Sequence, residues 1–289
     1  MENAIEITGV HKGYPGFHLS DVTLQVPAGH VTGLIGPNGA GKTTLIKLIL
    51  GTVQSDSGSV RVLGMDQSRE GADIRARVGF VHEVPPYYDF LSGRRFARLL
   101  RPYYRNWDQH VFEELCSEFA LPLAKRISAY SRGMRMKLAL AIALCHRADI
   151  LLMDEPTSGL DPVFRRELLD RLRVYLEEGG RTILFSTHIT SDLESIADYV
   201  LLLRHGKLCL SESADTLRER WRIVKGGRED LSAGVRDLLV AVEEHAYGFT
   251  ALTEHPVEVD SILGDRAAME RSSLGDLVYF VDKGRGGDA

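Results

Sequence analysis

The segment GPNGAGKT, residues 36–43, decides the fold because it fits the spacing G-x-x-x-x-G-K-[ST] between a strand pattern and a helix pattern. The apolar run VTGLI (31–35) precedes it, and the run TLIKLIL (44–50) follows it. Its glycines allow backbone N–H groups to close around phosphate oxygens, where side chains would block the approach. The segment therefore predicts a mononucleotide site at the end of a buried strand.

The side chains of this loop complete the predicted phosphate site. Lys42 is placed to neutralise the β- and γ-phosphates, and the Thr43 hydroxyl can ligate Mg²⁺. The predicted nucleotide-binding residues of the loop are Gly36, Pro37, Asn38, Gly39, Ala40, Gly41, Lys42, Thr43 and Thr44. Kinases, GTPases, helicases and transport ATPases all use such loops, so other residues must distinguish among these classes.

Strand and helix patterns alternate on both sides of the loop. Apolar runs predict strands near 4–8, 22–26, 31–35, 78–81, 150–153, 182–186 and 199–203, and apolar periodicity predicts helices over about 41–50 and 163–177. Residues from about 84 to 146 have a mostly helical pattern. The alternation predicts an α/β fold with a mainly parallel sheet, and the long helical stretch predicts an inserted helical subdomain.

The C-terminal part of the chain differs from the rest in charge. From Arg222 onward there are 8 basic and 13 acidic residues, which leaves 27 basic and 27 acidic residues of the chain's 35 and 40 elsewhere. A break near 222–230 predicts a linker, and a helix-like pattern covers 231–244. We expect a nucleotide-binding domain over 1–220 and a small α+β accessory region over 221–289. Neither part is basic enough to predict a nucleic-acid partner.

The composition is typical of a soluble globular protein, with 44% hydrophobic and 26% charged residues. The longest apolar runs, 138–145 and 148–153, are shorter than the ~20 residues that a spanning helix needs. The N-terminal stretch MENAIEITGV lacks the basic start and apolar core of a signal peptide. The three cysteines are widely spaced, which fits reduced thiols. We therefore expect a cytoplasmic protein.

Two carboxylates follow another buried strand pattern. The run ILLM (150–153) leads directly into Asp154 and Glu155. In a parallel sheet the carboxyl ends of the strands form the edge where ligands bind. One carboxylate there can hold the metal shell, and the next can accept a proton from an attacking water. The alternative is that the two acids only cap a helix before Pro156.

Five ordered motifs resemble those of one family, the ATP-binding subunits of ABC transporters. GPNGAGKTT is similar to its phosphate loop, YSRGM (130–134) to its signature motif, and LLMDEP to its second acidic motif. SGLD (158–161) is similar to the D-loop, and STH, which ends at His188, to the switch histidine. The order and spacing agree over residues 1 to about 220. The resemblance implies a P-loop ABC ATPase domain, an N-terminal antiparallel β region and a small α+β C-terminal extension.

The resemblance also implies roles for individual residues. It implies that Lys42, Glu155 and His188 are catalytic, that ATP is the nucleotide, and that Thr43 and Asp154 bind Mg²⁺. It implies that Tyr14 stacks on adenine; Phe17 is the competing candidate, and Tyr14 can instead be a core residue.

The family works as a pair of ATPase subunits, which implies a homodimer or a paralogous heterodimer. In that pair the signature helix of one subunit caps the ATP held by the other. The resemblance therefore assigns Ser131, Gly133 and the D-loop residue Asp161 to nucleotide binding across the pair. It further implies a separate transmembrane permease and a peripheral position at the cytoplasmic face of the membrane.

Two departures from the family's pattern bear on function. The signature usually reads L-S-G-G-Q, so Arg132 and Met134 are substitutions, and YSRGM is similar to the subgroup that serves ABC-2-type exporters. The segment VHE (81–83) places Glu83 where the family has a Gln. We expect Glu83 to be a Mg²⁺ ligand, because hard cations prefer carboxylate to amide oxygens. The alternative is that Glu83 points to solvent.

The start of the signature helix is unusually basic. Arg132, Arg135 and Lys137 crowd a first turn where the helix dipole favours acids, and no Asp or Glu occurs between Glu118 and Asp149. We expect these cations to be unopposed until a second subunit brings a γ-phosphate; a solvated basic face is the alternative. The nearby run PPYYDF (85–90) is expected to contact the permease through its aromatic rings, unless they are core residues.

Two other functions fit the sequence less well. A small GTP-binding switch protein is disfavoured because the sequence has no N-K-x-D guanine motif. A soluble ABC protein that acts on DNA or ribosomes usually carries two ATPase copies or a long coiled coil, and this chain has neither.

Overall fold

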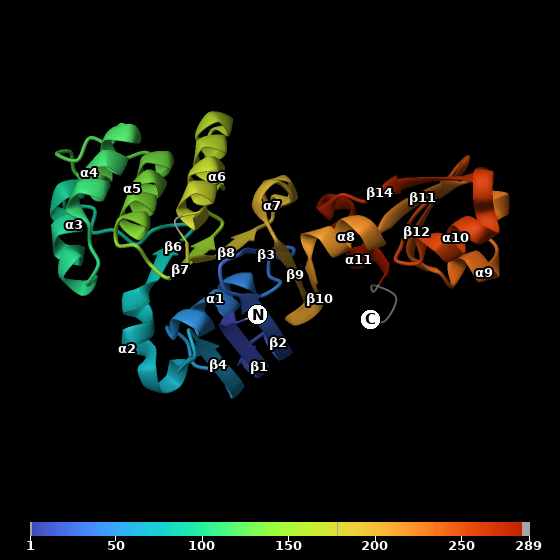
Figure 1. Cartoon of the computed structure of the whole chain (residues 1–289), viewed down its shortest axis with the longest axis horizontal. Coiled ribbons are helices and arrows are strands. Elements are labelled where there is room, and N and C mark those ends of the chain that lie inside the picture. The colour runs from blue at the N-terminus through green and yellow to red at the C-terminus, as the bar shows by residue number, and fades with distance from the viewer. Residues whose placement is uncertain (1, 178, 285–289) are drawn as a thin grey trace.

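The computed structural model describes residues 2–177 and 179–284 and shows an elongated molecule (Figure 1). A helical subdomain lies at one end, two sheets lie in the middle, and a separate small sheet with its helices lies at the other end (Figure 1). Among the described residues, every helix is too short or too polar to span a lipid bilayer.

The central sheet has six strands in the order β10-β9-β3-β8-β7-β6. These strands are β3 (Val31–Ile35), β6 (Val78–Val81), β7 (Ile150–Asp154), β8 (Thr182–Thr187), β9 (Tyr199–Arg204) and β10 (Lys207–Ser213). β10 pairs antiparallel with β9, whereas the other neighbours run parallel. Every residue of β3, β7 and β8 is buried, which explains their continuous apolar runs. The predicted mainly parallel sheet is confirmed.

An antiparallel sheet in the order β2-β1-β4-β5 packs beside the central sheet. It contains β1 (Asn3–Tyr14), β2 (Phe17–Pro27), β4 (Ser57–Val62) and β5 (Met65–Asp66), and the helices α1 (Lys42–Leu50) and α2 (Gln67–Arg77) accompany it. Apolar residues of this sheet, of α1 and of one face of the central sheet form one buried cluster. The phosphate loop is therefore anchored between two sheets.

The helical subdomain is inserted between β6 and β7, as the sequence predicts. It comprises α3 (Gly93–Leu100), η1 (Arg101–Tyr103), α4 (Gln109–Glu118), η2 (Ile127–Ala129) and α5 (Arg132–Cys145). The helices α6 (Pro162–Glu177) and α7 (Thr190–Ile196) follow β7 and β8. The last eight positions of α5, 138–145, are all small or apolar, and all of them are buried in the core that joins this subdomain to the sheet.

The C-terminal region forms an antiparallel sheet in the order β12-β13-β11-β14. Its elements are α8 (Ala214–Arg220), β11 (Arg222–Gly226), η3 (Arg228–Asp230), α9 (Ala233–Arg236), β12 (Leu239–His245), β13 (Gly248–Thr253), α10 (Pro256–Leu263), η4 (Gly264–Arg266), β14 (Ala267–Arg271) and α11 (Leu274–Gly284).

Two sequence predictions for this region are wrong. The predicted linker 222–230 begins with an inner strand, because β11 pairs with both β13 and β14. The predicted helix over 231–244 is a four-residue helix followed by β12, which forms a hairpin with β13. The apolar run 238–242, most of which forms β12, suits a helix or a buried strand equally, and the pairing with β13 decides between them.

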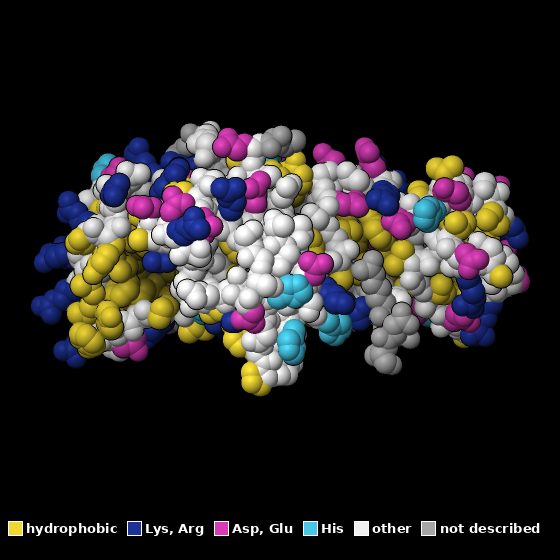
Figure 2. Space-filling view, turned by 90° about the horizontal axis from the view of Figure 1, so that it is seen from below, with side chains coloured by type: hydrophobic (Ala, Val, Ile, Leu, Met, Phe, Trp, Pro, Cys, Tyr) yellow, Lys and Arg dark blue, Asp and Glu magenta, His cyan; other side chains and the backbone are white. Residues whose placement is uncertain are grey.

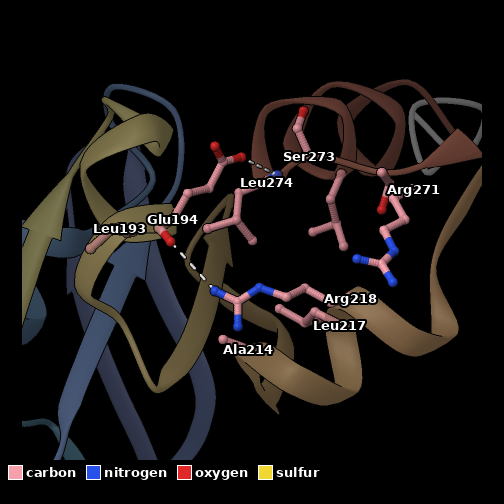
Figure 3. A pocket seen from close by; sticks show the side chains of 10 residues that line it. Leu193, Glu194, Ala214, Leu217, Arg218, Arg271, Ser273 and Leu274 are labelled. Atoms are coloured by element: carbon pink, nitrogen blue, oxygen red, sulfur yellow. Dashed lines mark hydrogen bonds between the residues drawn. The ribbon is translucent and has the colours of Figure 1, made fainter.

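The C-terminal helix α11 joins this region to the ATPase part of the chain. Arg204, at the end of β9, forms an ion pair with Asp282 at 2.7 Å. The Leu274 N–H at the start of α11 donates to the Glu194 carboxylate on α7 at 2.7 Å. Both residues line a cavity of about 350 Å³ between α7, α8 and α11 (Figure 3). The region is therefore packed onto the helix that follows the predicted switch histidine.

Candidate nucleotide-binding and catalytic site

The phosphate loop runs from the end of β3 to the start of α1, and two of its glycines are sterically required. A Cβ atom at Gly36 would lie 2.1 Å from the Leu203 carbonyl oxygen. Gly41 has φ 109° and is the N-cap of α1, and a Cβ there would lie 2.7 Å from the Phe17 ring. The loop can therefore approach β9 and the β1–β2 hairpin only with glycine at these positions.

The loop forms one wall of a cavity of about 400 Å³. The residues lining this cavity are Gly16, Phe17, Asn38, Gly39, Ala40, Gly41, Lys42, Thr43, Thr44, Glu83, Asp154 and Glu155. The structure thus brings most of the predicted loop residues together with all three predicted acids. Sequence reasoning missed Gly16, which lies in the Pro-Gly turn between β1 and β2.

The two aromatic candidates for adenine stacking lie in different places. Phe17 lines the cavity, whereas Tyr14 is not among the described residues that line it. The Tyr14 side chain is 38% exposed, and the Lys12 ammonium lies 5.6 Å from its ring centroid. The structure therefore places the competing candidate, Phe17, beside the phosphate loop.

Lys42 is buried and its ammonium group is held by the loop itself. Its Nζ donates to the Gly36 carbonyl at 2.7 Å and to the Pro37 carbonyl at 3.3 Å. The same Nζ lies 3.6 Å from the Glu155 Oε1 atom. A positive charge is thus fixed at the phosphate loop, next to the predicted base.

Thr43 and Asp154 meet at the same wall of the cavity. The Thr43 hydroxyl donates to Asp154 Oδ2 at 2.9 Å, and Asp154 is 1% exposed. The other carboxylate oxygen, Oδ1, is buried with no hydrogen-bond partner among the described residues. A buried carboxylate oxygen without a hydrogen-bond partner destabilises the fold unless a cation or a water molecule binds it. The Thr43 hydroxyl beside it is a second oxygen atom of the kind that Mg²⁺ prefers as a ligand.

Glu155 and His188 form the second pair of predicted catalytic residues. His188 Nδ1 lies 2.7 Å from Glu155 Oε2, and the His188 backbone N–H donates to the same oxygen at 3.3 Å. An ionised carboxylate can only accept, so Nδ1 carries the proton in this contact. Glu155 has φ 52°, a strained left-handed conformation for a residue with a side chain. The carboxylate is therefore held in one position by its neighbours.

The signature segment lies apart from this cavity. Ser131 is exposed and caps α5, where its hydroxyl accepts from the Met134 N–H at 3.2 Å. Asp161 caps α6 by accepting from the Phe164 N–H at 2.9 Å. Of the described residues that line the phosphate-loop cavity, none is Ser131, Gly133 or Asp161. The predicted site thus has two separate parts within one chain.

The expectation that the basic residues of α5 are unopposed is wrong. Arg132 pairs with Glu83 at 3.4 Å, and Arg135 pairs with Asp89 at 2.7 Å. The Arg135 guanidinium holds the pKa of the Asp89 carboxyl below its usual value through their hydrogen bond. Lys137 lies over the Phe164 ring, 4.2 Å from its centroid. Both acids come from the loop after β6. Sequence reasoning missed these pairs because the partners lie more than 40 positions apart in the chain.

Another link joins the helices that follow the two motifs. Arg165 on α6 donates to the Ser191 hydroxyl at 3.1 Å and pairs with the buried Asp192 on α7. The segment after Asp161 is thereby tied to the segment after His188. Sequence reasoning missed this pair, because neither residue belongs to a motif.

Comparison with known proteins gives three consistent relatives. Residues 19–158 match the family model described as ABC transporter. The chain is 33% identical over 192 residues to an uncharacterized ABC transporter ATP-binding protein, YdbJ of Bacillus subtilis, covering 66% of this chain and 62% of that protein. It is 32% identical to the bacitracin transport ATP-binding protein BcrA of Enterococcus faecalis, covering 88% and 82%. It is 35% identical to the lantibiotic transport ATP-binding protein SrtF of Streptococcus pyogenes, covering 68% and 85%.

Solved structures agree with these relatives. A structure of an ATP-binding subunit of an ABC transporter superposes with a TM-score of 0.69 at 29% identity, covering 75% of this chain and 92% of that one. An ATP-binding cassette solved as a dimer with ADP and Pi superposes with a TM-score of 0.67 at 23% identity, covering 72% and 98%. The second likeness concerns the fold alone.

Proposed function

This chain belongs to the ATP-binding proteins of the ABC transporter family, and from that premise we propose that its ATPase activity drives export through a separate permease of the ABC-2 type. The names of the relatives BcrA and SrtF describe transport of bacitracin and of a lantibiotic, which supports export. In this proposal residues 1–220 are the ATPase domain, residues 221–289 are an accessory region, and the protein binds the cytoplasmic face of the membrane.

The observation that carries the proposal is that the buried side chains of Lys42 and Glu155 meet beside the phosphate loop, where the more exposed His188 contacts Glu155. Glu155 is 7% exposed and is oriented by contacts with both neighbours. It is therefore placed to accept the proton of a water that attacks the γ-phosphate. Thr43 and Asp154, which line the same cavity, would hold Mg²⁺, which supplies positive charge to the phosphate oxygens.

We also propose that two ATPase subunits complete each other's sites, as a homodimer or a paralogous heterodimer. The exposed N-terminus of α5, with Ser131 and Gly133, lies outside its own cavity. Backbone N–H groups at a helix N-terminus bind phosphate oxygens well. A second subunit that presents its ATP to this helix end would join the two parts.

The permease is proposed to contact the region around the loop after β6. A cavity of about 440 Å³ there is lined by residues of α1 and β6, together with Pro86 and Tyr104. Tyr88 and Phe90 are exposed, whereas Tyr87 packs on Phe96 and donates to the Arg135 carbonyl at 2.7 Å. Figure 2 shows hydrophobic side chains gathered at the end of the molecule that carries the helical subdomain. Two of the three rings are therefore available for contact.

Co-purification tests the proposal. The chain would be expressed with an ABC-2-type membrane protein from the same genome, and the complex would be extracted in detergent. Phe90→Asp should abolish co-purification, because it places a charge in the apolar contact. Tyr247→Asp is the matched control, since Tyr247 is 98% exposed on the C-terminal hairpin. Equal recovery of the Phe90→Asp and wild-type complexes would contradict this contact surface.

A further inference from the structure

The two departures from the family's usual residues lie next to each other in the structure. Glu83 follows β6, and Arg132 is the first residue of α5. Their closest atoms, Arg132 Nη2 and Glu83 Oε1, are 3.4 Å apart. The same guanidinium nitrogen donates to the Ser158 hydroxyl at 3.2 Å. One arginine therefore connects the loop after β6, the signature helix and the segment before Asp161.

Glu83 also faces the phosphate-loop cavity. It lines the phosphate-loop cavity together with Thr43, Asp154 and Glu155. Three carboxylates thus face a cavity that contains a single lysine among its lining residues. An additional negative charge there repels a nucleotide in the absence of a metal and attracts a divalent cation. Arg132 offsets this charge within the chain.

We infer that Arg132 is a positioning residue that holds Glu83 in the metal-free protein and sets the magnesium requirement of the site. The ion pair is half-exposed on both sides, with side-chain exposures of 54% and 45%. Pairs of this kind are weak, so Mg²⁺ can compete for the carboxylate. This inference rests on the proposed nucleotide site and on Glu83 reaching the metal.

The experiment measures binding of a non-hydrolysable ATP analogue by calorimetry, first in EDTA and then at increasing Mg²⁺ concentrations. Arg132→Gln should weaken binding in EDTA by about fivefold, because Glu83 is left unpaired beside the phosphates. The same variant should lower the Mg²⁺ concentration that gives half-maximal binding by about fivefold, since the competing cation is gone. Arg132→Lys should restore wild-type values.

The second variant isolates the pair. Glu83→Gln should bind the analogue equally or more tightly in EDTA and should require more Mg²⁺. In that background Arg132→Gln should change neither quantity by more than about twofold, because the carboxylate that it controls is absent. Arg135→Gln is the matched control: it removes a neighbouring arginine whose partner, Asp89, does not line the cavity among the described residues.

The outcomes separate this inference from the proposed function. Equal effects of Arg132→Gln with and without Glu83 would overturn the inference while leaving nucleotide binding intact. An Arg135→Gln variant that shifts the magnesium requirement as much as Arg132→Gln would also overturn it, since a general loss of positive charge would then explain both. Failure of the wild-type protein to bind the analogue at any Mg²⁺ concentration would overturn the proposed function itself.

Discussion

The nucleotide site has two parts, and a single chain organises one of them much more fully than the other. At the phosphate loop, Lys42, Asp154 and Glu155 are buried and fixed by contacts within the chain. At the start of α5, Ser131 and Arg132 are exposed, and Arg132 is held by a weak surface ion pair. The first part is organised before any partner arrives, whereas the second presents a helix end to its surroundings.

This difference follows from where each part lies in the fold. The phosphate loop and the two acids follow β3 and β7, strands whose carboxyl ends meet at one edge of the buried sheet. The signature segment belongs to the helical insertion, whose position depends on packing against α6 and β6. Variants in the first part should therefore affect chemistry, and variants in the second should affect association.

Glu155→Gln should give the largest effect, a loss of turnover of about a thousandfold, because an amide cannot accept the proton of the attacking water. Steady-state ATP hydrolysis measures it. Binding of ATP should stay within about threefold of wild type, since the side chain keeps its size. Hydrolysis within about threefold of wild type would remove Glu155 from the role of base.

His188→Ala should slow hydrolysis by about a hundredfold, because it removes the ring that contacts Glu155 and, in the proposed mechanism, a donor to the γ-phosphate. The same hydrolysis assay applies. His110→Ala serves as the control, since His110 is exposed on α4, pairs with Glu114 on the same helix and is not among the described residues that line the phosphate-loop cavity. A normal rate for His188→Ala would mean that the STH motif is incidental.

The sequence predicted the first part better than the second, and the reason is physical. The phosphate loop is a local structure, so the spacing of Gly36, Lys42 and Thr43 already contains its geometry. The pairing of Glu83 with Arg132 joins residues 49 positions apart and depends on the packing of the whole helical insertion. The hairpin β12–β13 was missed for a different reason: its strands are neighbours in the sequence, but the apolar run of β12 suits a helix or a strand equally.

The aromatic residue was ambiguous for a related reason. Tyr14 and Phe17 are opposite partners across the turn of the β1–β2 hairpin. From sequence alone either ring can face the loop. In the folded hairpin Phe17 lines the cavity, and Tyr14 is not among the described residues that line it.

Phe17→Ala should weaken ATP binding by about tenfold, which corresponds to the loss of one aromatic–base stacking contact. Tyr14→Ala is the matched comparison and should stay within about twofold, because its ring lies outside the cavity wall. Fluorescence titration with an ATP analogue measures both. The reverse order of effects would restore Tyr14 as the stacking residue and would require the hairpin to move on binding.

The smallest expected change is a doubling of mass, and it tests whether the start of α5 needs a second chain while the phosphate loop does not. If the start of α5 completes a second chain's site, the Glu155→Gln protein should dimerise when Mg-ATP is added, because it binds ATP without consuming it. Light scattering should then show its mass rise from 32.1 kDa to twice that value. Without nucleotide the protein should be a monomer or a weak dimer. Gly133→Asp in the same background should bind ATP but stay monomeric, since its carboxylate would face the partner's γ-phosphate. The fold has room for this side chain, because a Cβ at Gly133 has its nearest neighbour at 3.9 Å. A Glu155→Gln protein whose mass does not change on adding Mg-ATP would count against capping between two chains.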